Sequence, residues 1–417
     1  MNVREIAYRC LCDTLLNQKY ANLSLRSLGE DLSEVDKSLA TQLVYGTLRN
    51  YRYVRYQWSL YVKKAPTEEL SILLDMSTYQ LYLLDKLPSY AVVNEAVEIA
   101  KGISGGNYVS LVNAVLRKVA ENGPQRVNET DEVTKMGVET SQPDWLIRLW
   151  LAHYGKKAMS DIAWDCLNDG KVALRANTLL TSEKELLQDP RFSQGDIPGC
   201  LYYDGNVLNT DYFRKNLVII QSESSQQVVQ IVDPRKNERI LDMCAAPGTK
   251  TVQMAMAVEN QAEIYAFDVY QQRVDLIKEA CEKYGTTCVN AMCADSRKLP
   301  VTLPLYYFDK VLLDAPCSGL GTLKHKPEIK INLKPEDIDE IVQLQSQLLD
   351  AAALMVKNGG HLTYSTCTLN KKENEKQIES FLLHHNDFEL VYQRTIFPYE
   401  NDSDGFYIAN MYKSVVE

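Results

Sequence analysis

The sequence predicts an α/β protein in which an all-α region comes first and a mostly parallel sheet with helices on both faces comes last. Two observations carry this prediction. Before residue 125 apolar residues recur at helical spacing, whereas after residue 225 short apolar strands alternate with helical segments. The 417 residues, 45% hydrophobic and 24% charged, suffice for two or three domains that each bury a core.

Residues 1–125 are predicted to form an all-α domain of five to seven helices. Apolar residues at i, i+3, i+4 and i+7 indicate one helix around 93–100 and another around 112–119. A tyrosine- and leucine-rich stretch at 70–85 indicates a further helix, stopped by Pro88. We interpret residues 126–224 as a small α/β connector domain, with a helix over 145–154 and strands at 172–177 and 217–220.

Residues 225–417 form the third predicted domain, in which each buried strand ends in a polar residue. Strands are expected at 239–243, 264–268, 310–314 and 361–365, with helices at 251–258, 271–284 and 338–356. Ligands on such sheets bind beyond the carboxyl ends of the strands. Asp242, Asp268, Asp314 and Ser365 stand at those ends.

The composition narrows the class of protein. The first residues show no apolar core with a cleavage site, and no run of about 18 apolar residues occurs, so we expect a cytoplasmic protein without a membrane span. Ten cysteines without a CxxC pair or Cys/His ligand spacing favour reduced thiols and no metal site. A formal net charge of −10 argues against a chain that coats nucleic acid through bulk charge.

The first strand is followed by a segment suited to close contact with a ligand. The helix opening at Thr249 and Lys250 supplies free backbone N–H groups. The spacing is neither that of a G-x-G-x-x-G turn nor that of a P-loop. Small residues and a glycine let the backbone approach a ligand along Cys244, Ala245, Ala246, Pro247 and Gly248.

Carboxylates after successive strands favour a nucleoside site. Asp268, 26 residues after Asp242, can accept both hydroxyls of a ribose. Asp295, after the expected third strand, can meet an adenine amino group. Any one of these residues could simply cap a helix or end a strand, but three in register indicate a nucleoside pocket.

Two cysteines are predicted to face the same cleft. Cys317 lies in Asp314-Ala-Pro-Cys-Ser-Gly after the fourth strand, and Cys367 in Thr363-Tyr-Ser-Thr-Cys-Thr after the fifth. Methyltransferases acting on exocyclic amines commonly have an aromatic residue where Cys317 stands, so the cysteine indicates a different target atom. We interpret the side chain of Cys244 as a buried hydrophobe, although its backbone belongs to the ligand-binding segment. The remaining cysteines are interpreted as buried hydrophobes as well: Cys10, Cys12, Cys166, Cys200, Cys281, Cys288 and Cys293.

Chemistry at C5 of a pyrimidine needs this set of groups. C5 becomes nucleophilic once a thiolate has added at C6, and it can then attack a sulfonium methyl group. A base must afterwards remove the C5 proton, and an acid near N3 relieves the negative charge that develops during addition. Cys367, Cys317 and Asp314 supply a thiol, an acid/base group and a carboxyl group.

The motifs CAAPGTK, DAPCSG and YSTCT, in this order, resemble the RNA 5-methylcytosine methyltransferases of the RsmB/NOP family, in particular its bacterial RsmB type. Residues 43–50, 88–97 and 112–117 resemble the NusB-like domain fused to that type. The resemblance implies a Rossmann-like methyltransferase domain, S-adenosylmethionine as methyl donor, and C5 of a cytosine in 16S ribosomal RNA, cytosine 967, as target.

The resemblance also implies roles for particular residues. Cys367 is the nucleophile, Cys317 assists product release, and Lys250 lies near the donor and the base. The sequence departs from the family pattern at Thr249, where a second glycine is usual, and at Ile331, where an aromatic residue is common. The cofactor is bound by the segment Cys244–Lys250 together with Asp268, Asp295 and Asp314.

Basic residues suggest where RNA binds. Residues 37–67 hold six Lys/Arg and no acid, and Arg49, Arg52, Arg55, Lys63 and Lys64 interleave with aromatic residues. The alternative is that the aromatics are helix core and the charges are merely solvated. A second basic cluster follows the fourth strand and consists of Lys324, His325, Lys326 and Lys330. We expect a monomer that takes an unpaired or flipped cytosine of 16S ribosomal RNA.

Two other functions remain open at this point. The same chemistry could act on transfer RNA, although the N-terminal domain favours ribosomal RNA by analogy. Alternatively, the chain could be a NusB-like RNA-binding factor with a vestigial catalytic domain, against which the presence of both Cys317 and Cys367 argues.

Overall fold

The computed structural model describes residues 2–84, 87–400 and 402–415, whose contacts divide the chain into two compact units. Unit 1 contains the chain up to Asp169 together with Leu323–Leu333, and unit 2 contains Gly170–Thr322 together with the chain from Lys334 onward. Within the described ranges, no helix has the length and apolar character needed to cross a membrane. The domain boundaries at residues 125 and 224 stay predictions.

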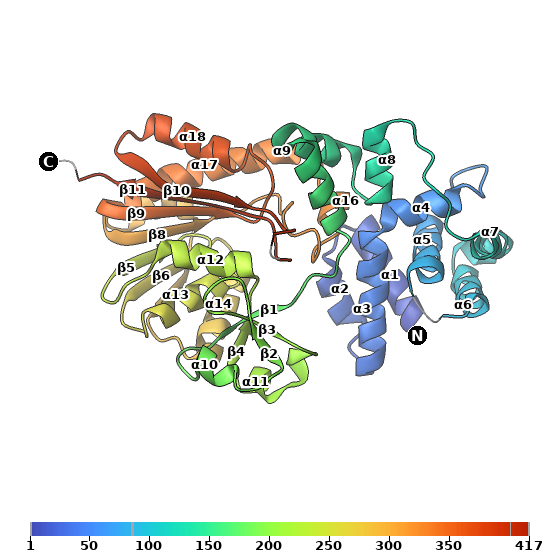
Figure 1. The fold of residues 1–417 in the computed structure, drawn as a ribbon, viewed down its shortest axis with the longest axis horizontal. Coiled ribbons are helices and arrows are strands. Elements are labelled where there is room, and N and C mark those ends of the chain that lie inside the picture. Colours follow the sequence, from blue (N-terminus) through green and yellow to red (C-terminus); the bar gives the residue numbers. More distant parts are fainter. Residues whose placement is uncertain (1, 85–86, 401, 416–417) are drawn as a thin grey trace. The chain divides into compact units, whose positions relative to one another are not determined.

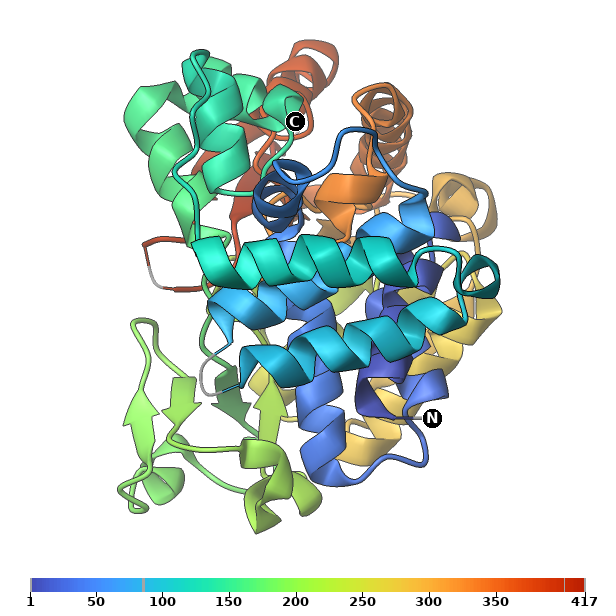
Figure 2. The ribbon, with the colours of Figure 1, turned by 90° about the vertical axis from the view of Figure 1, so that its right-hand side faces the viewer.

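Unit 1 is helical, as the periodicity predicts (Figures 1 and 2). The predicted helix at 70–85 is α5, which ends at Leu83, and residue 85 lies outside the described residues. Apolar faces of α1, α3, α5, α6 and α7 meet in one core that includes Leu11, Leu43, Leu73 and Leu116. The α-helices are α1 (Val3–Leu16), α2 (Ala21–Leu28), α3 (Glu34–Arg49), α4 (Tyr51–Ser59), α5 (Glu68–Leu83), α6 (Ser89–Lys101), α7 (Val109–Asn122), α8 (Glu132–Glu139), α9 (Asp144–Asp165) and α16 (Ile329–Asn332).

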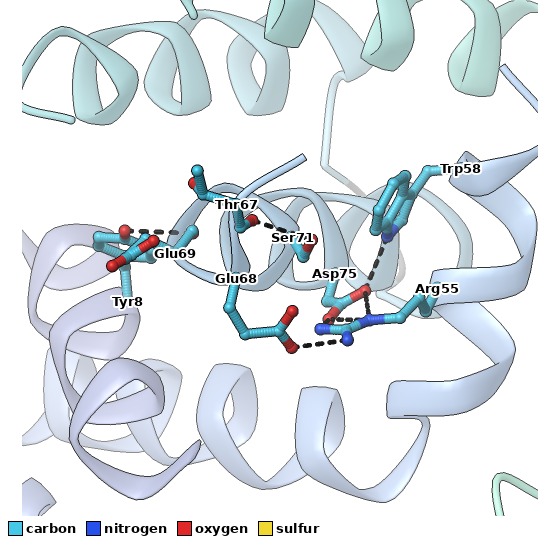
Figure 3. Close-up of polar contacts among 8 residues, drawn as sticks. All are labelled: Tyr8, Arg55, Trp58, Thr67, Glu68, Glu69, Ser71 and Asp75. Atoms are coloured by element: carbon cyan, nitrogen blue, oxygen red, sulfur yellow. Dashed lines mark hydrogen bonds and ion pairs between the residues drawn. The ribbon is translucent and has the colours of Figure 1, made fainter. Parts of the chain in front are cut away.

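A buried carboxylate links α4 to α5. Figure 3 shows Asp75 receiving two neighbours from α4: Arg55 Nη2 lies 2.7 Å from Asp75 Oδ2, and the indole Nε1 of Trp58 donates to Oδ1 over 2.7 Å. Glu68 also pairs with Arg55, but its side chain is half exposed. Asp75 itself is 1% exposed, so its charge depends on these donors.

The arginines of residues 37–67 have ion-pair partners within unit 1, and their contact with RNA stays a prediction. Arg55 is bound to Asp75, Arg52 Nη1 lies 2.5 Å from Asp144 Oδ1, and Arg49 is buried and paired with Asp169. Trp58 lies in the unit 1 core, and Tyr45, Tyr53 and Tyr61 pack against it. Lys63 and Lys64 are exposed. These aromatic residues therefore contribute to the core, as in the alternative interpretation, whereas the arginines form internal ion pairs rather than being merely solvated.

The prediction of a second basic cluster is wrong for two of its four residues, because Lys324 and Lys330 are buried in unit 1, whereas His325 and Lys326 are exposed. Lys324 is 1% exposed and its Nζ lies 2.7 Å from Asp165 Oδ2. Lys330 is 1% exposed and donates to the carbonyl oxygen of Arg49 over 2.8 Å. Burial lowers the pKa of Lys330 to about 7. Ile331 packs against the unit 1 core, which accommodates an aliphatic residue at this position.

Unit 2 holds a small antiparallel sheet and a large mostly parallel one. The small sheet has the order β2-β3-β1-β4, and its strands are β1 (Ala173–Ala176), β2 (Phe192–Gln194), β3 (Cys200–Tyr203) and β4 (Val218–Ile220). Beside it lie two short helices, α10 (Glu183–Leu186) and α11 (Asp211–Arg214). The strands predicted at 172–177 and 217–220 correspond to β1 and β4.

The large sheet confirms the predicted α/β class. Its order is β10-β11-β9-β8-β5-β6-β7. The five strands β9, β8, β5, β6 and β7 run parallel to one another, and β11 pairs antiparallel with both β9 and β10. The strands are β5 (Arg239–Asp242), β6 (Glu263–Asp268), β7 (Val289–Cys293), β8 (Phe308–Asp314), β9 (Val356–Thr366), β10 (Phe388–Ile396) and β11 (Phe406–Lys413). The sequence analysis does not predict the antiparallel strands β10 and β11.

Helices cover both faces of the large sheet (Figure 1). One face carries α12 (Glu223–Val232), α13 (Thr249–Ala257) and α14 (Gln271–Tyr284), and the other carries α15 (Leu299–Thr302), α17 (Asp337–Met355) and α18 (Glu375–His384). Buried apolar side chains of β8, β9 and α17, among them Leu313, Leu362 and Ala352, form the core between them. This core fixes the strands whose carboxyl ends carry the polar residues.

We expect Asp75→Ala to destabilise unit 1 by about 3 kcal/mol, because it leaves the guanidinium of Arg55 and the buried indole N–H of Trp58 without their acceptor. The matched control is Glu68→Ala, which removes the half-exposed partner of the same arginine and costs less than about 1 kcal/mol. Denaturant unfolding of the full chain measures both. Equal losses for the two variants would show that the buried carboxylate has no special role.

Candidate active site

The carboxyl ends of neighbouring parallel strands bring the predicted site residues to one edge of the large sheet. Asp242 ends β5, Asp268 ends β6 and Asp314 ends β8. In the strand register Asp314 stands opposite Ser365 of β9, one residue before the end of that strand. This arrangement follows from the alternation of strands and helices.

Asp242 is a buried acid with an unused oxygen. Its Oδ2 accepts a hydrogen bond from Thr251 Oγ1 over 2.7 Å, whereas Oδ1 is buried and has no hydrogen-bond partner within the described residues. Burial raises the pKa of Asp242 to about 7. Asp242 lines a small cavity with Cys244, Ala245, Ala246, Pro247, Thr249, Lys250 and Asp314.

The turn after β5 requires its glycine but tolerates Thr249. Gly248 has φ +99°, and a Cβ there would lie 3.2 Å from the Cα of Ile277. Thr249 is the first residue of α13 and has no positive φ. The threonine that replaces the usual second glycine therefore causes no backbone strain.

Asp268 and Asp295 both have hydrogen-bond or ion-pair partners within the protein. Asp268 is 4% exposed; it accepts the backbone N–H of Tyr270 over 3.3 Å, and its Oδ2 lies 3.5 Å from Arg273 Nε. Asp295 follows β7 and caps a 3-10 turn. Its hydrogen bond with Arg297 holds the pKa of its carboxyl below the ordinary value. Asp295 thus has an internal partner that accounts for part of its hydrogen-bonding capacity.

Lys250 and Asp314, which both line the small cavity, form an ion pair. Lys250 Nζ lies 2.7 Å from Asp314 Oδ2, and Ser365 donates to Asp314 Oδ1 over 2.7 Å. Burial disfavours the ammonium group, but the carboxylate of Asp314 outweighs it and raises the pKa of Lys250. The ammonium also lies 5.3 Å from the ring centroid of Phe406, a contact that the sequence does not predict.

The two predicted cysteines lie side by side. Cys317 Sγ and Cys367 Sγ are 3.4 Å apart, both half-buried. The hydrogen bond with Cys367, together with burial, raises the pKa of the Cys317 thiol well above its ordinary value. A nucleobase bound next to one of these sulfur atoms would therefore lie close to the other as well.

Close backbone packing holds the segment after Cys317. The N–H of Gly321 donates to the carbonyl oxygen of Cys367 over 3.0 Å, and the N–H of Gly405 donates to that of Gly321 over 2.7 Å. A Cβ on Gly321 would lie 2.0 Å from the oxygen of Gly405, so only glycine fits there. The Asp404-Gly405-Phe406 motif thus closes against the segment that carries Cys317.

The other cysteines mostly agree with the interpretation as buried hydrophobes, with one clear exception. Cys10, Cys166, Cys200 and Cys281 are buried, and Cys12, Cys244 and Cys288 are half-buried. Cys293 is exposed, so its interpretation as buried is wrong; it ends the edge strand β7, which has no neighbour on its outer side in the large sheet. Within the described residues no cluster of three or more His, Cys, Asp or Glu is arranged to hold a metal ion.

The chemistry of the cavity fits a cationic nucleoside. A sulfonium centre and an amino group are positive, and two carboxylates line this cavity, Asp242 with an unpartnered buried oxygen and Asp314. Asp242 and Asp314 are therefore residues of this cavity that can hold a cationic ligand. Glu373 accepts a hydrogen bond from the backbone N–H of Ser318, the residue after Cys317. The sequence analysis does not predict this contact.

Family models match both ends of the chain, and relatives that are similar over nearly its whole length belong to the same family. The family described as 16S rRNA methyltransferase RsmB/F matches residues 229–412, and the NusB family matches residues 1–121. The probable ribosomal RNA small subunit methyltransferase B of Bacillus subtilis (strain 168) is 35% identical, covering 99% of both chains. The protein of the same description from Synechocystis sp. is 32% identical, covering 99% of this chain and 100% of its own.

The fold also matches a solved structure over nearly its whole length. The crystal structure of PH0851 aligns with a TM-score of 0.82 and 25% identity, covering 98% of this chain and 99% of that one. The predicted family and enzyme class are confirmed by these similarities. The chain belongs to the ribosomal RNA small subunit methyltransferase B family of S-adenosylmethionine-dependent RNA methyltransferases, with a NusB-family region at its N-terminal end.

Proposed function

We propose that this protein methylates C5 of a cytosine in 16S ribosomal RNA, cytosine 967, through a covalent bond between Cys367 and C6 of the base. The observation that carries the proposal is the 3.4 Å separation of Cys367 Sγ and Cys317 Sγ beside the Lys250–Asp314 pair. The ribosomal substrate rests on the relatives, which are described as ribosomal RNA small subunit methyltransferases.

In the proposed first step the thiolate of Cys367 adds to C6 and the C5=C6 electron pair becomes available at C5. Negative charge then develops towards N3 and O2 of the base. We assign the stabilisation of this charge to the ammonium of Lys250 rather than to the carboxyl of Asp314, because Asp314 is the ion-pair partner that holds the ammonium in place. S-adenosylmethionine, when bound, supplies a methyl group on a sulfonium, which C5 takes up.

In the second step a base, Cys317 in this proposal, takes up the C5 proton. The electron pair of that C–H bond re-forms the C5=C6 double bond as the bond between Cys367 Sγ and C6 breaks, which restores the aromatic ring and the Cys367 thiolate. We assign the assistance of this step to Cys317, because its sulfur lies next to that of Cys367. Without it the methylated base stays attached to the protein.

We assign donor binding to Asp268, Asp295, Asp314 and the segment Cys244–Lys250. Asp242 supports this assignment, because its free Oδ1 lies among the residues that line the cavity. The RNA partner presents its cytosine unpaired or flipped, since C6 of a stacked base is shielded from a thiolate.

We expect the wild-type protein to methylate one cytosine of 16S ribosomal RNA and Cys367→Ala to lose this activity by several orders of magnitude. Bisulfite sequencing of the incubated RNA measures both. Donor binding by calorimetry should stay within about twofold, because Cys367 does not line the donor cavity. Turnover by Cys367→Ala, or methylation of transfer RNA instead, would overturn the assignment.

Cys317→Ala is expected to accumulate a protein–RNA adduct, because addition and methyl transfer proceed while elimination stalls. A denaturing gel of the incubated mixture shows the adduct as a slowly migrating band. The control Cys293→Ala changes an exposed cysteine outside the pair and should turn over normally. Release of product by Cys317→Ala at the wild-type rate would contradict the role of Cys317.

Asp268→Ala should weaken donor binding about tenfold to a hundredfold, since a buried acceptor for the ribose hydroxyls is lost. The matched control is Asp275→Ala, an exposed acid on α14. Calorimetric titration with S-adenosylmethionine compares the two variants. An unchanged affinity in Asp268→Ala would place the ribose elsewhere.

A further inference from the structure

A buried carboxylate lies directly behind the two cysteine segments. Glu373 is 0% exposed and follows β9 in the segment before α18. Its Oε2 accepts the backbone N–H of Ser318 over 2.8 Å, and its Oε1 accepts the hydroxyl of the same residue over 2.5 Å. Ser318 is the residue after Cys317, so this carboxylate fixes the segment of that cysteine by two bonds.

The network continues to the other cysteine. Ser318 Oγ lies 2.7 Å from Thr368 Oγ1, and Thr368 directly follows Cys367. The hydroxyl proton of Ser318 is given to Glu373, so in this pair Thr368 must be the donor. A chain of hydrogen bonds therefore runs from Glu373 through Ser318 to Thr368, one residue behind each sulfur.

Glu373 is itself held from two further sides. Asn370 Nδ2 donates to its Oε1 over 2.9 Å, and Gln345 Nε2 of α17 donates to its Oε2 over 3.2 Å. Gln345 Nε2 also donates to the carbonyl oxygen of Pro316 over 2.9 Å. Four donors thus converge on the two carboxylate oxygens, and an amide in this place would direct an N–H group at some of them.

A carboxylate without an ion-pair partner is a costly way to fill a protein interior. No salt bridge to Glu373 occurs among the described residues, so its charge is balanced by hydrogen bonds alone. A group that served only to fill the space would be cheaper as an apolar side chain. The arrangement therefore points to a role in the geometry of the cysteine pair.

We propose that Glu373 is a positioning residue that sets the relative placement of Cys317 and Cys367 by clamping Ser318 and, through it, Thr368. The inference rests on the proposed function, in which Cys317 assists release from Cys367. A displaced Cys317 slows elimination more than addition, because addition needs only Cys367. Loss of Glu373 should therefore resemble loss of Cys317 in its chemistry.

The test compares Glu373→Gln with Glu375→Gln in the full-length protein, with 16S ribosomal RNA and S-adenosylmethionine. Glu375 lies two residues further on, is half-buried and accepts a bond from Thr395 over 2.9 Å, away from both cysteines. We expect Glu373→Gln to lower kcat by about a hundredfold and to accumulate a protein–RNA adduct, with donor affinity unchanged. Glu375→Gln should behave like wild type.

A second variant covers the case in which Glu373→Gln fails to fold. Thr368→Val keeps the shape of the side chain and removes only the bond to Ser318. It should lower kcat by roughly fivefold to tenfold, again with adduct accumulation. Rescue of kcat by Glu373→Asp above the level of Glu373→Gln would further support a role of the carboxylate.

The outcomes separate the two proposals. If Cys317→Ala accumulates adduct but Glu373→Gln and Thr368→Val turn over like wild type, the positioning role is overturned and the proposed function stands. If Cys367→Ala retains turnover and no variant forms an adduct, the proposed function itself fails. A lower kcat in Glu373→Gln without adduct would also overturn the positioning role, because it would show that addition rather than elimination is impaired.

Discussion

The structure of the candidate site depends on the parallel pairing of β8 with β9. This pairing sets Asp314 opposite Ser365, and the two chain segments that continue from these strands carry Cys317 and Cys367. The backbone bond from Gly321 to Cys367 and the close approach of Gly405 then keep the segments together. Without this register the two sulfur atoms would not meet at 3.4 Å.

Electrostatics around the cysteines divides the site into two regions. Asp242 and Asp314 make the lining of the small cavity acidic, which suits a positively charged ligand. Lys250 brings an ammonium group to the same cavity. The carboxylate of Asp314 raises the pKa of Lys250 and so favours the charged form. The hydrogen bond with Cys367 and burial raise the pKa of the Cys317 thiol, and the buried carboxylate of Glu373, bound to Ser318, adds to this rise.

The sequence predicts the sheet and its polar strand ends well, because buried parallel strands are short apolar runs and the site residues follow them directly. Asp242, Asp268, Asp314 and both cysteines could be placed in this way. The basic surfaces could not. Whether Arg55 or Lys324 is exposed depends on acids distant along the chain, Asp75 and Asp165, and only the folded chain brings these together.

Glu373 illustrates the same limit. It lies six residues after Cys367, but nothing in its local sequence indicates that its carboxylate turns back to the N–H of Ser318, 55 residues earlier. The pair β10 and β11 was missed for a related reason, since antiparallel strands at the end of a parallel sheet follow no βαβ pattern. Thr249 departs from the family pattern, yet it begins α13 without a positive φ.

The claim that Cys367 bonds to the base is tested most directly with RNA in which the target cytosine carries fluorine at C5. Fluorine cannot leave as a proton does, so the wild-type protein should stay attached to the RNA after methyl transfer. Mass spectrometry of the digested complex should then find the nucleotide on the peptide that contains Cys367. Attachment to the Cys317 peptide, or no attachment while ordinary RNA is methylated, would contradict the account.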